Sequence, residues 1–113
     1  MLTIENFFSS LEGAYAPNTI RSYRSDYMHY SNWCQKYHCD PFNIHEEQFA
    51  DYILQMGESL TVATVQRRVA SLSSIFSLTK NANPTKEPMV ILTLKKTSKE
   101  VWQTPETGDT SDF

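Results

Sequence analysis

Positions 18–37 of the chain read NTIRSYRSDYMHYSNWCQKY, and this stretch decides the fold class. Its apolar and aromatic side chains recur at spacings of three and four residues, namely Ile20, Tyr23, Tyr27, Tyr30, Cys34 and Tyr37. Such spacing is typical of one face of an α-helix, and Trp33 widens that face. Asn18 suits the N-cap, and the residue before Pro41 resists the α region. We therefore predict a helix over residues 19–37.

A second long helix is predicted after Thr61, whose hydroxyl suits an N-cap. The same spacing recurs there, at Val62, Val65, Val69, Leu72, Phe76 and Thr79. Valine favours strands, but the helical period and a run of about 18 residues are not those of a strand. The Asn-Ala-Asn sequence at residues 81–83 is expected to end this helix.

Three shorter helices are predicted at residues 3–13, 46–56 and 87–96. Glycine commonly follows the end of a helix, so Gly13 and Gly57 are expected to end the first two. Thr85 is expected to cap the last, with Pro88 in its first turn. The chain is thus predicted to be all-α, a small bundle of four to five helices.

The composition fits one domain followed by a tail. Hydrophobic residues make up 40% of the 113 residues, which is enough for one compact core. After Trp102 the sequence is rich in Thr, Asp, Glu, Pro and Ser, a composition typical of flexible segments. We expect a helical domain over residues 1–99 and an acidic linker or tail over residues 100–113.

The net charge of −3 conceals an uneven distribution. Residues 17–37 carry a net charge of +2 and residues 60–99 carry +6, whereas the remaining segments are acidic. Such asymmetry indicates a polyanionic partner for one face of the molecule.

Motifs of catalysis, metal binding and membrane insertion are missing from the sequence. It has no Gly-rich phosphate loop, no H-E-x-x-H and no G-x-S-x-G, so we expect no cofactor. His29, Cys34, His38 and Cys39 cluster, but Cys34 falls on the apolar face, which favours a buried thiol over a zinc site. No apolar run or leader indicates a membrane, and two cysteines indicate the reducing cytoplasm.

The outer faces of the two long helices share a chemistry near their N-termini. Arg21 opposes the apolar face of the first helix, as Thr64, Arg67 and Ser71 do on the second. Helix N-termini favour phosphates, and arginine adds a fork of donors for phosphates or guanine. From the pattern alone an ordinary solvated surface is the alternative, because these residue types are common on exposed helices.

Three stretches of the chain are similar to motifs of one known family. In the first, Thr19, Tyr23, Asp26, Tyr30 and Trp33 match the family's long first helix. The second, LTVATVQRRV at residues 60–69, resembles a later helix opening, and the third, NPTKEPMV at residues 83–90, resembles the lead into the last helix. In this order and spacing they resemble the core-binding, SAM-like N-terminal domain of tyrosine recombinases, the phage-integrase family.

The resemblance implies one half of a DNA clamp, with a catalytic domain as the other half. By position it implies these DNA contacts: Thr19, Arg21, Ser22, Arg24, Thr61, Thr64, Arg67, Arg68, Ser71, Lys95, Lys96 and Lys99. The implied parent integrates or recombines DNA through a phosphotyrosine linkage. This chain, ending at Phe113, has no catalytic set, so it is expected to be a fragment without that activity.

The expected partners are duplex DNA at a recombination site, the parent's own catalytic domain and other copies bound to the same DNA. The expected location is the cytoplasm, with the chromosome. A small helical protein-interaction module without DNA binding is the alternative. Exposed apolar side chains would favour it, and Met28, Met89, Val90 and Ile91 are the candidates.

Overall fold

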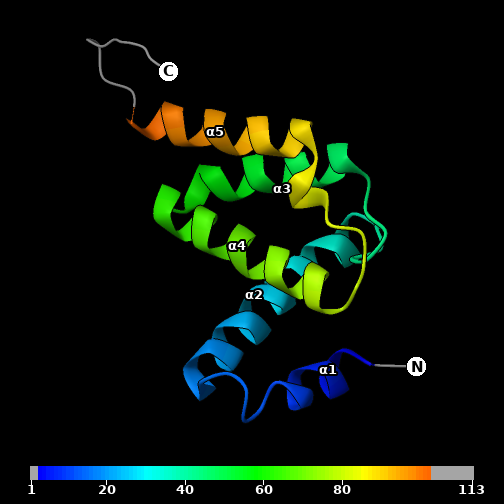
Figure 1. Ribbon diagram of the computed structural model, residues 1–113. Coiled ribbons are helices and arrows are strands. Elements are labelled where there is room, and N and C mark those ends of the chain that lie inside the picture. Colours follow the sequence, from blue (N-terminus) through cyan, green and yellow to red (C-terminus); the bar gives the residue numbers. More distant parts are fainter. Residues whose placement is uncertain (1–2, 103–113) are drawn as a thin grey trace.

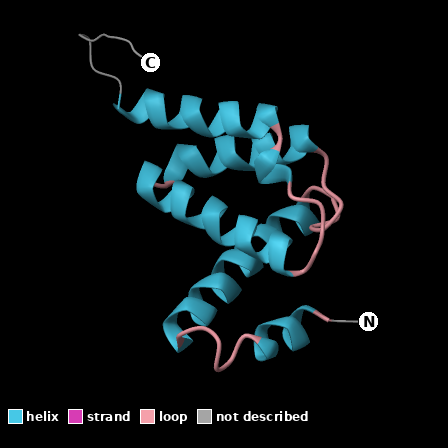
Figure 2. Ribbon diagram, viewed as in Figure 1, coloured by secondary structure: helices cyan, strands magenta, loops and turns pink. Residues whose placement is uncertain are grey.

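The computed structural model describes residues 3–102, with side chains through Thr97, and these residues form helices joined by loops and turns (Figure 2). The elements are α1 (Ile4–Ser10), α2 (Pro17–Lys36), α3 (Glu46–Ser59), α4 (Val62–Leu78), the short 3-10 helix η1 (Pro84–Lys86) and α5 (Pro88–Trp102). The predicted all-α class is confirmed. Among these helices, none is both long enough and apolar enough to cross a bilayer.

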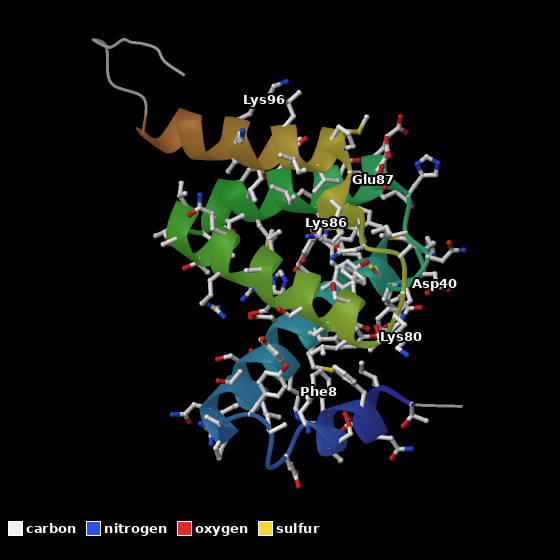
Figure 3. The ribbon with its side chains drawn as sticks, in the orientation of Figure 1. Phe8, Asp40, Lys80, Lys86, Glu87 and Lys96 are labelled. Atoms are coloured by element: carbon white, nitrogen blue, oxygen red, sulfur yellow. The ribbon has the colours of Figure 1, made fainter. Side chains whose placement is uncertain are left out.

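Helices α3 and α5 lie side by side and run in the same direction, while α4 returns along them in the opposite direction (Figure 1). Helix α2 crosses beneath α4, and α1 packs on the N-terminal half of α2 (Figure 1). Phe8 reaches from α1 toward α2, where its ring centroid lies 6.1 Å from that of Tyr27 (Figure 3). Helix α4 is therefore enclosed by α2 on one side and by α3 and α5 on the other.

An aromatic cluster at the centre of the bundle joins α2, α3 and α4. Tyr30 is fully buried, and its ring centroid lies 5.5 Å from Phe49, 5.3 Å from Tyr52 and 5.8 Å from Phe76. Its hydroxyl donates a hydrogen bond of 2.7 Å to the carbonyl of Pro41. The predicted apolar faces of the two long helices therefore form the core, because each contributes its central aromatic ring to this cluster.

The ends of α2 differ from the prediction. The helix begins at Pro17, because the fixed φ of proline and its missing N–H suit the first helical position. Ala16 is the N-cap residue, and the Asn18 side chain accepts instead from Arg21. At the other end Tyr37 is the C-cap with a non-helical φ of −104°, so it leaves the apolar face and is exposed.

The shorter helices also differ at their ends. Helix α1 ends at Ser10, and Gly13 lies beyond it in a turn with a φ of +88°. Thr85 does not cap α5, since it lies in η1 and donates through its backbone N–H and hydroxyl to Asn83. Helix α5 continues to Trp102, through the position where the linker was expected to begin. The predicted tail, from residue 103 onward, lies outside the described residues.

Gly57 does not end α3, which continues to Ser59. It stands where α3 meets α5, and a Cβ at this position would lie 3.0 Å from Cγ2 of buried Thr97. Contacts of that length are too short for a comfortable fit. The glycine therefore permits the close approach of the two helices rather than a turn.

We predict that the effect of Gly57→Ala depends on Thr97. Alanine normally stabilises a helix interior by about 1 kcal/mol over glycine, but here the gain should be cancelled by the crowding of Thr97. In a Thr97→Ser background the methyl group is gone and the hydroxyl bond to the Thr93 carbonyl can remain, so the gain should reappear. Urea unfolding of the four variants measures this coupling, and an equal effect of Gly57→Ala in both backgrounds would contradict it.

Candidate nucleic-acid interface

The N-termini of α2 and α4 lie on the same side of the molecule, at the left in Figure 1, and the helices cross farther along, where the middle of α2 passes α4. We call the exposed or half-buried predicted contacts in the N-terminal parts of these two helices the α2–α4 face. Its members are Arg21, Ser22, Thr61, Thr64 and Arg67. The face thus combines two cationic side chains with three hydroxyls.

The α2 side of the face is built by the first turns of that helix. Arg21 and Ser22 are exposed, and Nη1 of Arg21 donates to Oδ1 of Asn18 at 2.7 Å. Thr19 is half-buried beside them. Arg24 faces α1 instead, where it pairs with Glu5 and lies 4.9 Å above the ring of Phe8. Arg24 therefore serves to attach α1 to α2.

The α4 side of the face begins at its cap. The Thr61 hydroxyl oxygen accepts from the backbone N–H of Thr64 at 3.2 Å, which confirms the predicted N-cap. The same hydroxyl donates to Oγ1 of Thr64 at 2.9 Å. Both threonines therefore stand at the positive end of the helix dipole, where anions are favoured.

A buried carboxylate at the helix crossing holds both arginines of α4. Asp26 of α2 is only 1% exposed. Its Oδ2 accepts from Nη1 of Arg67 at 2.7 Å, and its Oδ1 accepts from Nη2 of Arg67 at 3.2 Å and from Nε of Arg68 at 3.1 Å. The side chain of Arg67 is 51% exposed and that of Arg68 is 13% exposed. Arg67 therefore reaches solvent, whereas Arg68 lies mostly inside.

Two of the predicted contacts on α4 are placed differently from the expectation. Ser71 was expected on the outer face but is buried, because α4 packs against helices on both sides and its buried arc is wider than one apolar stripe. Arg68, expected beside that face, is drawn inward by Asp26. Neither side chain belongs to the α2–α4 face.

The lysines of α5 do not join the α2–α4 face. Lys95 and Lys96 are exposed, and Lys96 projects from the outer side of α5, away from α4 (Figure 3). The side chain of Lys99 lies outside the described part of the chain. Lys95 and Lys96 therefore lie in a separate basic region on α5.

His29 and Cys34, two members of the histidine and cysteine cluster, lie in environments that the fold itself explains. Nδ1 of His29 lies 2.7 Å from the hydroxyl of Tyr52, and burial, followed by the charge of Arg68, lowers the pKa of His29. Cys34 is a buried free thiol, and burial raises its pKa to about 12. A zinc ligand must be a thiolate, so this environment favours the thiol form that the sequence interpretation preferred.

Comparison with known proteins assigns the fold to a family. Residues 4–83 match the model of the phage integrase N-terminal SAM-like domain. The chain belongs to this family. This integrase domain is also 30% identical over 83 residues to an "Integrase/recombinase xerD homolog" of Selenomonas ruminantium. That match covers 71% of the chain but 24% of the relative, so the chain spans about a quarter of the relative's length.

The role of Asp26 in this integrase domain was not among the predicted functions. In the sequence, Asp26 is one of the positions that match the family's long first helix. One signal was present, since Asp26 follows Tyr23 by three residues and precedes Tyr30 by four, which places a carboxylate on the core face. A buried carboxylate requires a cationic partner, and the adjacent pair Arg67 and Arg68 on the other long helix was available.

Proposed function

We propose that this integrase domain binds duplex DNA at the recombination site of a tyrosine recombinase. The observation that supports the proposal is the α2–α4 face, where two arginines and three hydroxyls are exposed or half-buried in the N-terminal parts of two helices that begin on the same side of the molecule. Family membership supports it, because the matching model describes the N-terminal domain of phage integrases. In this role the domain works in the cytoplasm, with the chromosome.

The chemistry of the face suits the backbone and groove of a duplex. Helix N-termini and short hydroxyls donate to phosphate oxygens, and arginine can contact either phosphates or guanine. Two acidic side chains of this region are paired within the fold, because Asp26 is bound by two arginines and Glu5 by Arg24. The net charge of −3 therefore does not oppose local binding of a polyanion.

The remaining steps of recombination are assigned to the rest of the parent protein. We propose that a catalytic domain beyond this chain cuts and rejoins the strands, while the present domain closes the other side of the duplex. Other copies on the same DNA complete the assembly. The size of the xerD homolog, of which this domain matches 24%, is consistent with a larger parent.

One observation favours a protein-interaction role as the second candidate. Met89, Ile91 and Leu92 are exposed along α5, and Met28 is exposed on α2. Val90, which was expected in the same patch, is buried against the core. Leu92 takes the place of Val90 in the exposed set, and three of its four residues lie on α5 rather than on the α2–α4 face.

Binding of duplex DNA is predicted to weaken steeply with salt. Neutralising two phosphates, one for each arginine of the face, gives a slope of about −2 for log affinity against log salt. Titration of a fluorescent duplex by anisotropy between about 50 and 200 mM salt measures this slope. Arg21→Gln is expected to flatten it by about 1.

Lys80→Gln provides the matched control, because it removes one charge beyond the C-terminus of α4, the end opposite the α2–α4 face (Figure 3). Its slope should equal that of the unaltered chain. Absence of binding at low salt, or binding that ignores salt, contradicts the DNA-binding proposal and leaves the interaction module as the better account.

A further inference from the structure

Asp26, Arg67 and Arg68 form an ion cluster at the crossing of α2 and α4, and its two arginines differ in exposure and in contacts. Arg68 is 13% exposed, donates through Nε to Asp26 and directs Nη1 toward the Met56 sulfur at 3.9 Å. Arg67 is 51% exposed and grips both oxygens of the same carboxylate. Arg68 thus closes the inner side of the cluster, and Arg67 forms its outer side.

Arg67 retains hydrogen-bonding capacity beyond the contact with Asp26. A guanidinium carries five N–H groups in a rigid plane, and the fork to Asp26 uses one on each terminal nitrogen. The second N–H on each terminal nitrogen and the Nε–H are not used by that carboxylate. Because half of the side chain is exposed, these groups can meet a ligand while the fork stays intact.

We propose that Asp26 is a positioning residue for DNA binding, which holds the Arg67 guanidinium ready to donate to a phosphate of the duplex. The inference rests on the proposed DNA-binding function. A long arginine side chain normally loses rotamer freedom when it binds a ligand, which weakens binding. Because the fork to Asp26 already fixes the Arg67 guanidinium in the folded domain, this loss does not recur when DNA binds. Asp26 itself is buried and does not touch the DNA.

Simple electrostatics makes the opposite prediction for this carboxylate. If Asp26 only neutralised the arginines, removing its charge would strengthen DNA binding and steepen the salt dependence. If Asp26 positions Arg67, the Asp26→Asn variant should bind more weakly although it carries one more net positive charge. The sign of the change therefore separates the two accounts.

The experiment measures duplex affinity at fixed low salt for the unaltered chain, Asp26→Asn, Arg67→Ala and the double variant. Circular dichroism and thermal melting confirm that each variant is folded at the temperature used. We expect Asp26→Asn to weaken binding by about tenfold, the order of one charge-assisted hydrogen bond. In the Arg67→Ala background the same substitution should have no further effect, because the residue through which it acts is gone.

A second variant decides the matter if Asp26→Asn does not fold. Arg67→Lys keeps the charge and leaves Arg68 on Asp26, but a single ammonium cannot reproduce the planar fork. We expect it to weaken binding severalfold, whereas Lys80→Arg should leave affinity unchanged. Binding by Arg67→Lys at the unaltered level would overturn the proposal.

Two results are distinguishable from a failure of the DNA-binding function itself. Tighter or equal binding by folded Asp26→Asn, with normal binding by the unaltered chain, rejects the positioning role alone. Additive losses in the double variant reject it as well, since they indicate independent effects. Absence of salt-dependent binding by the unaltered chain rejects the proposed function and this inference together.

Discussion

Replacing Tyr30 with alanine is expected to lower the free energy of unfolding by about 4 kcal/mol, the range for deleting a buried aromatic side chain. The side chain is 0% exposed and contacts rings from α3 and α4, so its loss leaves a cavity between three helices. Its hydroxyl also satisfies the Pro41 carbonyl in the loop after α2. Urea unfolding followed by circular dichroism measures the loss.

Two further variants test the sources of this loss. One removes only the hydroxyl of Tyr30, and the other makes the same Tyr-to-Ala change at an exposed position. Tyr30→Phe keeps the ring and removes only the bond to Pro41, so we expect a loss of about 1 kcal/mol. Tyr37→Ala makes the same change at the C-cap of the same helix, where the side chain is 42% exposed, and should cost clearly less than Tyr30→Ala. Equal losses at the two positions would contradict the central role of Tyr30.

The helices and the core could be predicted from the sequence because they depend on local periodicity. The spacing of Tyr27, Tyr30 and Cys34 on α2 places all three on the buried face, as the structure shows. Val65 and Leu72 follow the same rule on α4. The spacing of apolar residues along a helix indicates which face is buried, whichever element covers that face.

The ends of the helices depend on neighbours that are distant in sequence. Gly57 resembles a helix stop in the sequence. In the structure a glycine is needed there because a Cβ would crowd Thr97 of α5. Asn18 is a good cap residue in isolation, but Pro17 before it already begins the helix. The predicted outward position of Ser71 is wrong for a related reason. Helix α4 is covered on two sides, so it buries residues outside its apolar stripe.

The candidate site was predicted as a set of residue types, and the structure adds their partners. Arg21 and Arg67 were expected to face the ligand, and both are exposed. Arg24 and Arg68 have the same chemistry in the sequence but pair with Glu5 and Asp26. The Asp26 contacts span 41 and 42 residues of chain. The local pattern places Asp26 on the core face but does not specify which distant residues pair with it.

Replacing Asp26 with alanine is expected to lower the free energy of unfolding by about 3 to 5 kcal/mol, the range for breaking a buried ion pair from one side. Arg67 can turn to solvent when its partner is lost, because half of its side chain is already exposed. Arg68 is 13% exposed and has no such exit, so its charge would remain inside without a counterion. Urea unfolding is again the measurement.

The cost should arise from the unpaired charge and not from the missing contact itself. The double variant Asp26→Leu with Arg68→Met replaces the inner part of the pair by apolar side chains, so it should recover most of the lost stability. Glu5→Ala removes the carboxylate of the exposed pair with Arg24 and should cost less than about 1 kcal/mol. If Asp26→Ala costs no more than Glu5→Ala, or if the double variant recovers nothing, the crossing of α2 and α4 is stabilised by apolar packing and not by this ion cluster.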